Sequence, residues 1–275
     1  MTQRIETIAG RRVLIDEPAA PATAADTLLL LHGWPDSAAL WDETVAALSA
    51  RFRCVRFSWP GFASDDARGT HSLAELTALL HQVALQANGG APVTLVLHDW
   101  GCVFGYHFAR LHPALVSRVV GIDVGDANSR EHRAGLTFKA QLGIAGYQLW
   151  LALAWAIGGG VGDRMARRLS AAMRVPRPAE QIHARMGYPY WMAWTGANGG
   201  MKDARTFHPQ VPMLYLYGRR KPFMFQSTAW TQALAARPGC RVREMDTRHW
   251  VMLDAPAAFQ RELLDWLGPT ALPRP

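Results

Sequence analysis

Short apolar runs alternate with amphipathic stretches along the first half of the chain. Four runs have the composition of buried strands: Thr27–Leu31, Arg53–Ser58, Pro92–Leu97 and Arg118–Val124. Helical periodicity fills the intervals between them, over Ser37–Arg51, Ser72–Ala87 and Cys102–Leu111. Because strands and helices alternate at this spacing, we expect an α/β fold in which helices wrap a mostly parallel sheet.

Two local patterns add detail near the amino-terminal end. Arg4–Asp16 alternates apolar and polar residues around Ala9-Gly10-Arg11, which predicts a β-hairpin, and a Pro- and Ala-rich loop over Glu17–Ala25 follows. Ser72 and Glu75 have the spacing of a capping box, so the helix of this region should begin directly after Ser72.

The alternation stops after Asp126. Residues 128–206 contain only helical patterns, and strand and helix patterns then return over Val211–Tyr217, Thr228–Ala236, Arg241–Met245 and Pro256–Leu267. We therefore predict a sheet of about eight strands. Its core would be formed by residues 1–127 and 207–275, with an inserted helical cap at 128–206 that covers the carboxyl ends of the strands.

One stretch of the insert, Leu142–Ile157, has no charged residue and carries Tyr147, Trp150 and Trp155. It is short for a membrane span, and its Gly and Gln residues weaken that interpretation. We expect a buried helix of the cap, with contact to a membrane as the alternative.

Composition narrows the class of protein. The chain has 275 residues, is 49% hydrophobic and carries a formal net charge of +7, mostly from arginine. No run of five like charges occurs, and the densest basic stretches are Arg164–Arg174 and Arg237–Arg248. We expect a solvated basic surface and no nucleic-acid partner, the alternative being a membrane or nucleic-acid patch.

The cysteines and the amino terminus bear on the compartment. Cys54, Cys102 and Cys240 are widely spaced, with no disulfide or metal-binding pattern, and Met1–Ala9 lacks the apolar region of a secretory signal. These features favour a reducing cytoplasm. No stable membrane span is expected, and the chain should be a monomer or a homodimer.

The segment with the most chemical information is Val96–Gly101, which reads Val-Leu-His-Asp-Trp-Gly. Asp99 follows a buried strand and precedes a helix, where serine hydrolases place their nucleophile, and Gly101 and Gly105 allow close helix–strand packing. A carboxylate at this position attacks carbon and leaves an ester that water must split, which suits epoxides and alkyl halides. The alternative is an Asp that only caps the following helix.

Four short motifs occur in a set order: His32-Gly33-Trp34-Pro35, Pro60-Gly61-Phe62, His98-Asp99-Trp100-Gly101 and His249-Trp250. With them the chain resembles α/β-hydrolase-fold enzymes of the epoxide hydrolase and haloalkane dehalogenase group, over about residues 25–267. The resemblance implies that Asp99 is the nucleophile and that His249 is the base that activates water. Arg248 stands where this group usually has Gly.

The acid that orients His249 is the main irregularity. Many relatives have Gly-x-x-Asp-Pro after the strand that here is Val211–Tyr217, but this chain has Lys221 at the acid position. The resemblance also allows an acid after the preceding strand. Alignment without gaps places Asp126 there, and the alternatives are Asp123, Asp246 or no working acid.

The remaining roles also follow from the resemblance. Backbone N–H groups of Trp34 and Trp100 would form the oxyanion hole. Tyr147 and Tyr190 would protonate the epoxide oxygen, with Tyr188 as a substitute for Tyr190. The substrate-binding candidates are Tyr188, Trp150 and Phe223, which would contribute to a mainly apolar pocket.

The function predicted from these features is hydrolysis of an apolar epoxide to a vicinal diol through an ester on Asp99, without metal or organic cofactor. One alternative is a haloalkane dehalogenase that uses the same nucleophile. Another is a hydrolase-fold binding protein with little turnover, suggested by Lys221 at the usual acid position. Fold alone does not decide among them.

Overall fold

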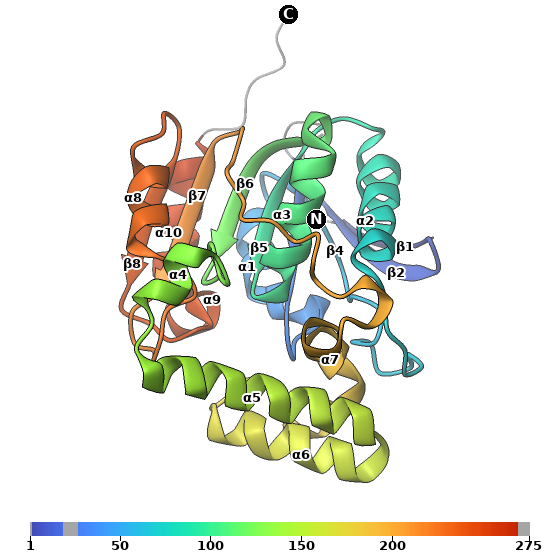
Figure 1. Cartoon of the computed structure of the whole chain (residues 1–275). Coiled ribbons are helices and arrows are strands. Elements are labelled where there is room, and N and C mark those ends of the chain that lie inside the picture. The colour runs from blue at the N-terminus through green and yellow to red at the C-terminus, as the bar shows by residue number, and fades with distance from the viewer. Residues whose placement is uncertain (1, 19–26, 269–275) are drawn as a thin grey trace, which may run out of the picture.

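A single twisted sheet forms the centre of the molecule (Figure 1). The computed structural model describes residues 2–18 and 27–268. Its eight strands follow the order β1-β2-β4-β3-β5-β6-β7-β8. Their bounds are β1 Thr2–Ile8, β2 Arg11–Glu17, β3 Thr27–Leu31, β4 Arg53–Phe57, β5 Val93–His98, β6 Val116–Ile122, β7 Met213–Gly218 and β8 Arg241–Met245. The hairpin β1–β2 and the β2–β4 pair are antiparallel, whereas the other pairs are parallel.

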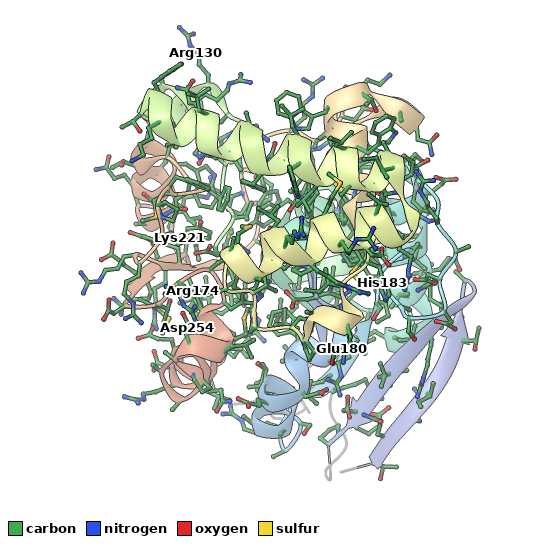
Figure 2. All side chains as sticks on the ribbon, turned by 90° about the horizontal axis from the view of Figure 1, so that it is seen from below. Arg130, Arg174, Glu180, His183, Lys221 and Asp254 are labelled. Atoms are coloured by element: carbon green, nitrogen blue, oxygen red, sulfur yellow. The ribbon has the colours of Figure 1, made fainter. Side chains whose placement is uncertain are left out.

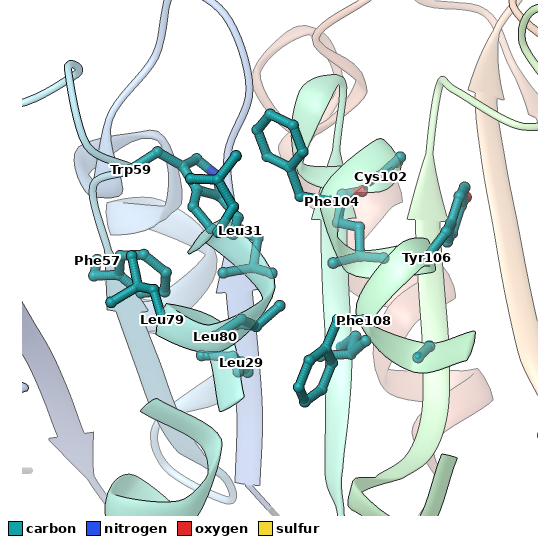
Figure 3. Close-up of a cluster of buried hydrophobic side chains, with 14 of the residues drawn as sticks. Leu29, Leu31, Phe57, Trp59, Leu79, Leu80, Cys102, Phe104, Tyr106 and Phe108 are labelled. Atoms are coloured by element: carbon teal, nitrogen blue, oxygen red, sulfur yellow. Dashed lines mark hydrogen bonds between the residues drawn. The ribbon is translucent and has the colours of Figure 1, made fainter. Parts of the chain in front are cut away.

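Helices cover both faces of the sheet. The helices outside the insert are α1 Asp42–Leu48, α2 Leu73–Asn88, α3 Trp100–Leu111, α8 Thr228–Ala235, α9 Val251–Asp254 and α10 Pro256–Leu267. Alternate residues of a strand point to opposite faces. Accordingly, Leu29 and Leu31 belong to a cluster with side chains of α2 and α3, part of which Figure 3 shows, whereas Leu28 and Leu30 belong to a second cluster with side chains of α1, α9 and α10.

Most predicted elements of the core are confirmed within a few residues. Ser72 forms the expected capping box with Glu75 at the start of α2. The continuous helix predicted over Ser37–Arg51 is wrong, because a 3₁₀ turn at Ala38–Trp41 precedes a short α1. The predicted loop at Glu17–Ala25 lies mostly outside the described residues.

The insert is helical in all its described elements. Between β6 and β7 it holds α4 Arg130–Gly135, α5 Phe138–Ile157, α6 Gly159–Ala172 and α7 Tyr188–Thr195, joined by short 3₁₀ turns. Figure 1 shows α5, α6 and α7 beyond one end of the sheet. We refer to residues 128–206 as the cap segment, and their status as a separate domain stays a prediction.

The helix expected to be buried in the cap segment is largely exposed. Among the described residues, α5 is long and apolar enough to cross a membrane, yet only 17% of its most apolar stretch is buried. Leu151, Ala152 and Ala154 face inward. The prediction of a buried helix was wrong because an uncharged sequence does not reveal which of its faces is covered.

Candidate active site

Asp99 lies at a sharp turn between β5 and α3. All six residues of β5 are buried, and α3 begins at Trp100. Asp99 has φ 53° and ψ −122°, a conformation rare for a residue with a side chain, at a cost of about 1–3 kcal/mol. Gly101 makes the turn possible, because a Cβ there would lie 2.3 Å from the carbonyl oxygen of Leu31. The fold therefore holds this carboxylate at the carboxyl end of the sheet.

One oxygen of Asp99 is held by backbone N–H groups. The N–H of Trp34 donates to Asp99 Oδ1 at 2.7 Å, and the N–H of Trp100 also hydrogen-bonds the carboxylate. A Cβ on Gly33 would lie 2.2 Å from Asp99 Oδ1, so only glycine permits this approach. The two predicted oxyanion-hole residues thus both contact Asp99.

His32 supports the loop that carries Trp34. Its ring is fully buried and hydrogen-bonds the Gly33 carbonyl through Nδ1 and the Trp59 N–H through Nε2. Burial lowers the pKa of His32 to about 3, so the ring stays neutral. These contacts indicate a structural role for His32.

His249 links two carboxylates. Its Nε2 lies 3.6 Å from Asp99 Oδ2, and its Nδ1 hydrogen-bonds Asp123 Oδ2. Asp123 follows β6 directly, is fully buried, and accepts a further hydrogen bond at 2.9 Å from the N–H of Gly218 through Oδ1. Asp99, His249 and Asp123 therefore form a connected triad.

The predicted acid, Asp126, does not contact His249. Its Oδ1 accepts the N–H of Ser227 at 2.6 Å, and its Oδ2 accepts the hydroxyls of Ser129 and Ser227 at 2.7 Å each. Asp126 thus ties the start of α4 to the start of α8. Asp246 is also excluded by position, since it is exposed and pairs with Arg219 at 3.1 Å. The strand ends at Ile122, so the first carboxylate beyond it is Asp123; the ungapped alignment missed this.

Lys221, which stands where many relatives have the acid, contacts Asp123. Its Nζ lies 2.5 Å from Asp123 Oδ1, and its side chain is 5% exposed. Burial would raise the pKa of Asp123, but the charges of Lys221 and His249 outweigh burial and lower it. Asp123 is therefore an ionised carboxylate with a cation on each side.

The charge of His249 follows from its neighbours. Burial would lower its pKa, but the carboxylates of Asp123 and Asp99 outweigh burial and raise it to about 9. Burial likewise opposes ionisation of Asp99, yet the hydrogen bond and charge of His249 lower that pKa. At neutral pH the free protein thus holds an imidazolium between two carboxylates.

Arg248, which replaces the usual Gly, does not enter the site. Its backbone N–H and its guanidinium both hydrogen-bond Asp254, at 2.7 Å and at 2.7–3.1 Å. The pair is 45% and 11% exposed, so it contributes little stability on its own. It closes the turn that presents His249.

A cavity of about 730 Å³ opens onto Asp99. Its wall includes Trp100, Tyr147, Tyr190 and Trp194, together with Val103, Met192 and Phe225, which sequence reasoning missed. The rings of Tyr147 and Tyr190 meet edge to face with centroids 6.0 Å apart. Burial raises the pKa of both phenols, and the charge of Asp99 raises it further, so both keep their protons.

The three residues predicted to bind substrate lie in three different surroundings. Phe223 stacks on Tyr147 with centroids 6.2 Å apart, behind the cavity wall. Tyr188 instead packs on Phe62 and His71, and its hydroxyl has no hydrogen-bond partner among the described residues. Trp150 lies on the outer surface, where its indole N–H donates to the Met165 carbonyl. None of Phe223, Tyr188 and Trp150 is part of the cavity lining, so the structure does not bring these three predicted residues to the cavity wall.

Comparison with known proteins identifies similar chains. The alpha/beta hydrolase fold family matches residues 26–161. Two relatives from Mycobacterium tuberculosis are "Probable oxidoreductase EphD", 28% identical over 135 residues, and "Epoxide hydrolase B", 30% identical over 124 residues. These matches cover 48% and 44% of this chain. They cover 22% and 35% of the relatives, so the match spans about a fifth to a third of their length.

Solved structures extend the similarity to nearly the whole chain. An epoxide hydrolase from Bacillus megaterium has a TM-score of 0.70 at 17% identity, covering 96% of this chain and 99% of that one. A haloalkane dehalogenase, DbeA from Bradyrhizobium elkanii, has a TM-score of 0.68 at 17% identity, covering 97% and 96%. At such identity the likeness is one of fold.

Proposed function

Because this chain has the α/β-hydrolase fold, we propose that it hydrolyses apolar epoxides to vicinal diols through an ester on Asp99. One observation carries the proposal. The cavity that opens onto Asp99 also contains two buried, protonated phenols, those of Tyr147 and Tyr190. Opening an epoxide needs such a pairing, a nucleophile on carbon and an acid for the ring oxygen.

The contacts of Asp99 assign its two oxygens different roles. Oδ1 is held by the Trp34 N–H, so the nucleophile is Oδ2, which faces His249 Nε2 at 3.6 Å. Oδ2 attacks a ring carbon, the carbon–oxygen bond of the ring breaks, and its electron pair goes to the ring oxygen. That oxygen takes a proton from a tyrosine, which recovers one through solvent from the His249 imidazolium.

Formation of the ester prepares the second step. The ester is neutral, so His249 loses one of the two negative charges that raise its pKa. The neutral ring then takes a proton from water, which attacks the ester carbonyl. The N–H groups of Trp34 and Trp100 stabilise the oxyanion on Oδ1. The bond between the acyl carbon and Oδ2 breaks, and its electron pair goes to Oδ2. The departing alkoxide takes the proton of the hydroxyl group that water added to the acyl carbon, so the diol leaves and the Asp99 carboxylate and the imidazolium return.

A mass measurement tests this proposal. The variant His249→Gln lacks the base, so incubation with a panel of apolar epoxides should trap an ester whose mass gain equals the whole epoxide. Peptide mapping should locate it on Asp99. The control Asp99→Ala should gain nothing. If His249→Gln stays unmodified with every epoxide although the wild type consumes one of them, the ester mechanism is refuted.

Haloalkane dehalogenation is a second candidate, supported by one observation. The indole nitrogen of Trp34 is buried without a hydrogen-bond partner among the described residues, and such an N–H could hold a departing halide. The Trp100 indole, however, hydrogen-bonds Tyr190. With haloalkanes, the same His249→Gln variant would gain an alkyl group and release halide.

A further inference from the structure

An apolar stripe runs along the outer face of α5. Phe138, Leu142, Leu149, Leu153 and Ile157 recur at helical spacing, so they lie on one side of the helix. Their side chains are between 46% and 74% exposed. Trp150 beside them is 41% exposed, and Val161 on α6 continues the stripe at 49%. The apolar residues on the opposite side of α5 are already used to bind the rest of the molecule.

The stripe faces away from the core. Figure 2 views the molecule from the cap side, and α5 and α6 lie side by side at its front. Exposed apolar residues that occur singly are normal on a protein surface, but a contiguous row of them marks an interaction site. The charges around the row indicate what kind of partner it binds.

The charge of the chain is segregated onto this part of the molecule. The cap segment, residues 128–206, contains eleven Lys and Arg residues against four Asp and Glu. The remainder of the chain contains eighteen of each, so the cap segment accounts for the whole net charge of +7. A neutral core thus carries a cationic cap.

Several of these cations border the stripe. Lys139 is next to Phe138, Arg130 and Arg133 precede α5, and Arg164 and Arg168 are exposed on α6. Within the part of the chain that the structure describes, Arg130, Arg164 and Arg168 form no ion pair. An apolar row with an uncompensated cationic border is the composition of a helix that lies in the plane of a membrane interface.

We propose that this face docks on the surface of an anionic lipid bilayer. A second copy of the chain is disfavoured, because two cap segments of the same charge would meet. Nucleic acid matches the charge but offers nothing for the apolar row, whereas an anionic bilayer offers both phosphate and hydrocarbon. The helix lies on the bilayer and does not cross it, since its inner side packs against α6 and α7.

The cavity mouth lies close to this face. Trp194 lines the cavity, is 45% exposed, and donates its indole N–H at 3.2 Å to Gln148, the residue before Leu149 of the stripe. An apolar molecule dissolved in the bilayer would therefore reach the cavity without crossing much water. Docking itself does not depend on the proposed reaction.

Vesicle sedimentation tests the proposal. The wild-type chain should sediment with phosphatidylcholine vesicles that contain phosphatidylglycerol, and about tenfold less with phosphatidylcholine alone, because the cationic border is attracted only by anionic lipid. The triple variant Leu142→Gln, Leu149→Gln, Leu153→Gln should lose binding to both. The variant Arg164→Gln with Arg168→Gln should reduce binding to anionic vesicles alone.

Matched substitutions elsewhere control for hydrophobicity and charge. Ile5→Gln with Leu111→Gln removes side chains that are 49% and 47% exposed on the core, and Arg237→Gln with Arg261→Gln removes two exposed core cations. Both should bind like the wild type, and circular dichroism should show all variants folded. Equal binding to both vesicle types, or equal loss in stripe and control variants, overturns the proposal. The face would instead bind a second copy of the chain if the wild type does not bind vesicles, and if light scattering shows a wild-type dimer that the triple variant of the stripe cannot form.

Discussion

The two halves of the candidate site are built differently. Asp99, His249 and Asp123 follow strands of the core. Backbone N–H groups hold the carboxylates of Asp99 and Asp123, and Lys221 forms an ion pair with Asp123. Tyr147 and Tyr190 project from α5 and α7 and are positioned by ring contacts with other aromatic side chains. The core thus fixes the positions of the charged groups, whereas the cap segment contributes aromatic side chains to the cavity wall. Substitutions on the core side should abolish turnover, and substitutions on the cap side should select which substrate turns over.

The largest effect is expected at the triad acid. Asp123→Asn removes the carboxylate that fixes the His249 tautomer, so kcat/KM for an epoxide from the panel should fall on the order of 10⁴-fold. Asp126→Asn should leave kcat within a few-fold and lower the melting temperature, because Asp126 joins α4 to α8 and does not contact His249. Steady-state kinetics and thermal melts measure both. Equal losses of activity would contradict the assignment of Asp123.

The cap tyrosines come next. Tyr147→Phe and Tyr190→Phe each remove one proton donor, so epoxide opening should slow about 10²-fold, at the low end for a general acid. Reaction with an alkyl halide, whose leaving group needs no proton, should be unaffected. Single-turnover mass spectrometry of ester formation measures both substrates in one variant. Equal slowing for the two would mean that the tyrosines only shape the cavity.

Lys221 should set the pH dependence. The second step needs neutral His249, so activity should fall as the pH drops below the His249 pKa in the ester form. Lys221→Met removes a cation beside Asp123, and this loss favours the imidazolium form of His249. The acid limb of the pH–activity profile should therefore move upward by roughly one pH unit. Lys221→Arg should restore the wild-type limb, and the exposed control Arg219→Met should not shift it. A limb that stays in place for Lys221→Met would exclude this role.

The smallest effect separates two tryptophans of the cap segment. Trp194→Ala enlarges the cavity mouth and should raise KM a few-fold for apolar epoxides. Trp150→Ala should leave kcat and KM unchanged, because this side chain lies on the outer surface. Kinetics with a soluble epoxide in the absence of lipid makes this comparison. A raised KM for Trp150→Ala would mean that Trp150 does contact the substrate.

The central part of the core could be predicted from sequence because strands such as β3 and β5 are buried on both faces. Such strands read as uninterrupted apolar runs, and Thr27–Leu31 was predicted with its observed bounds. The turn at Asp99 was also visible, since it follows such a run and has glycines where the helix approaches the sheet. Asp123 was missed for a local reason: three residues separate it from Asp126, and only the end of β6 decides which one faces His249.

The cap segment was harder to predict because its helices are apolar on more than one side. Sequence periodicity cannot distinguish the buried side of α5 from its exposed side when both carry leucine and tryptophan. Tyr188 and Tyr190 illustrate the same difficulty, since residues two apart on a helix point in nearly opposite directions. Only the packing reveals that Tyr190 faces the cavity and Tyr188 the interior next to Phe62.

The single hydrogen bond from Trp34 to Asp99 Oδ1 has a consequence for isotopes. In the proposed mechanism Oδ1 never leaves its N–H donors, whereas Oδ2 departs in the diol and an oxygen from water replaces it. A protein that reacts once in ¹⁸O-labelled water should therefore carry one heavy oxygen in the peptide containing Asp99. Transferred to ordinary water, it should pass that atom to the first diol it then makes, so the side chain keeps a one-atom record of its last turnover.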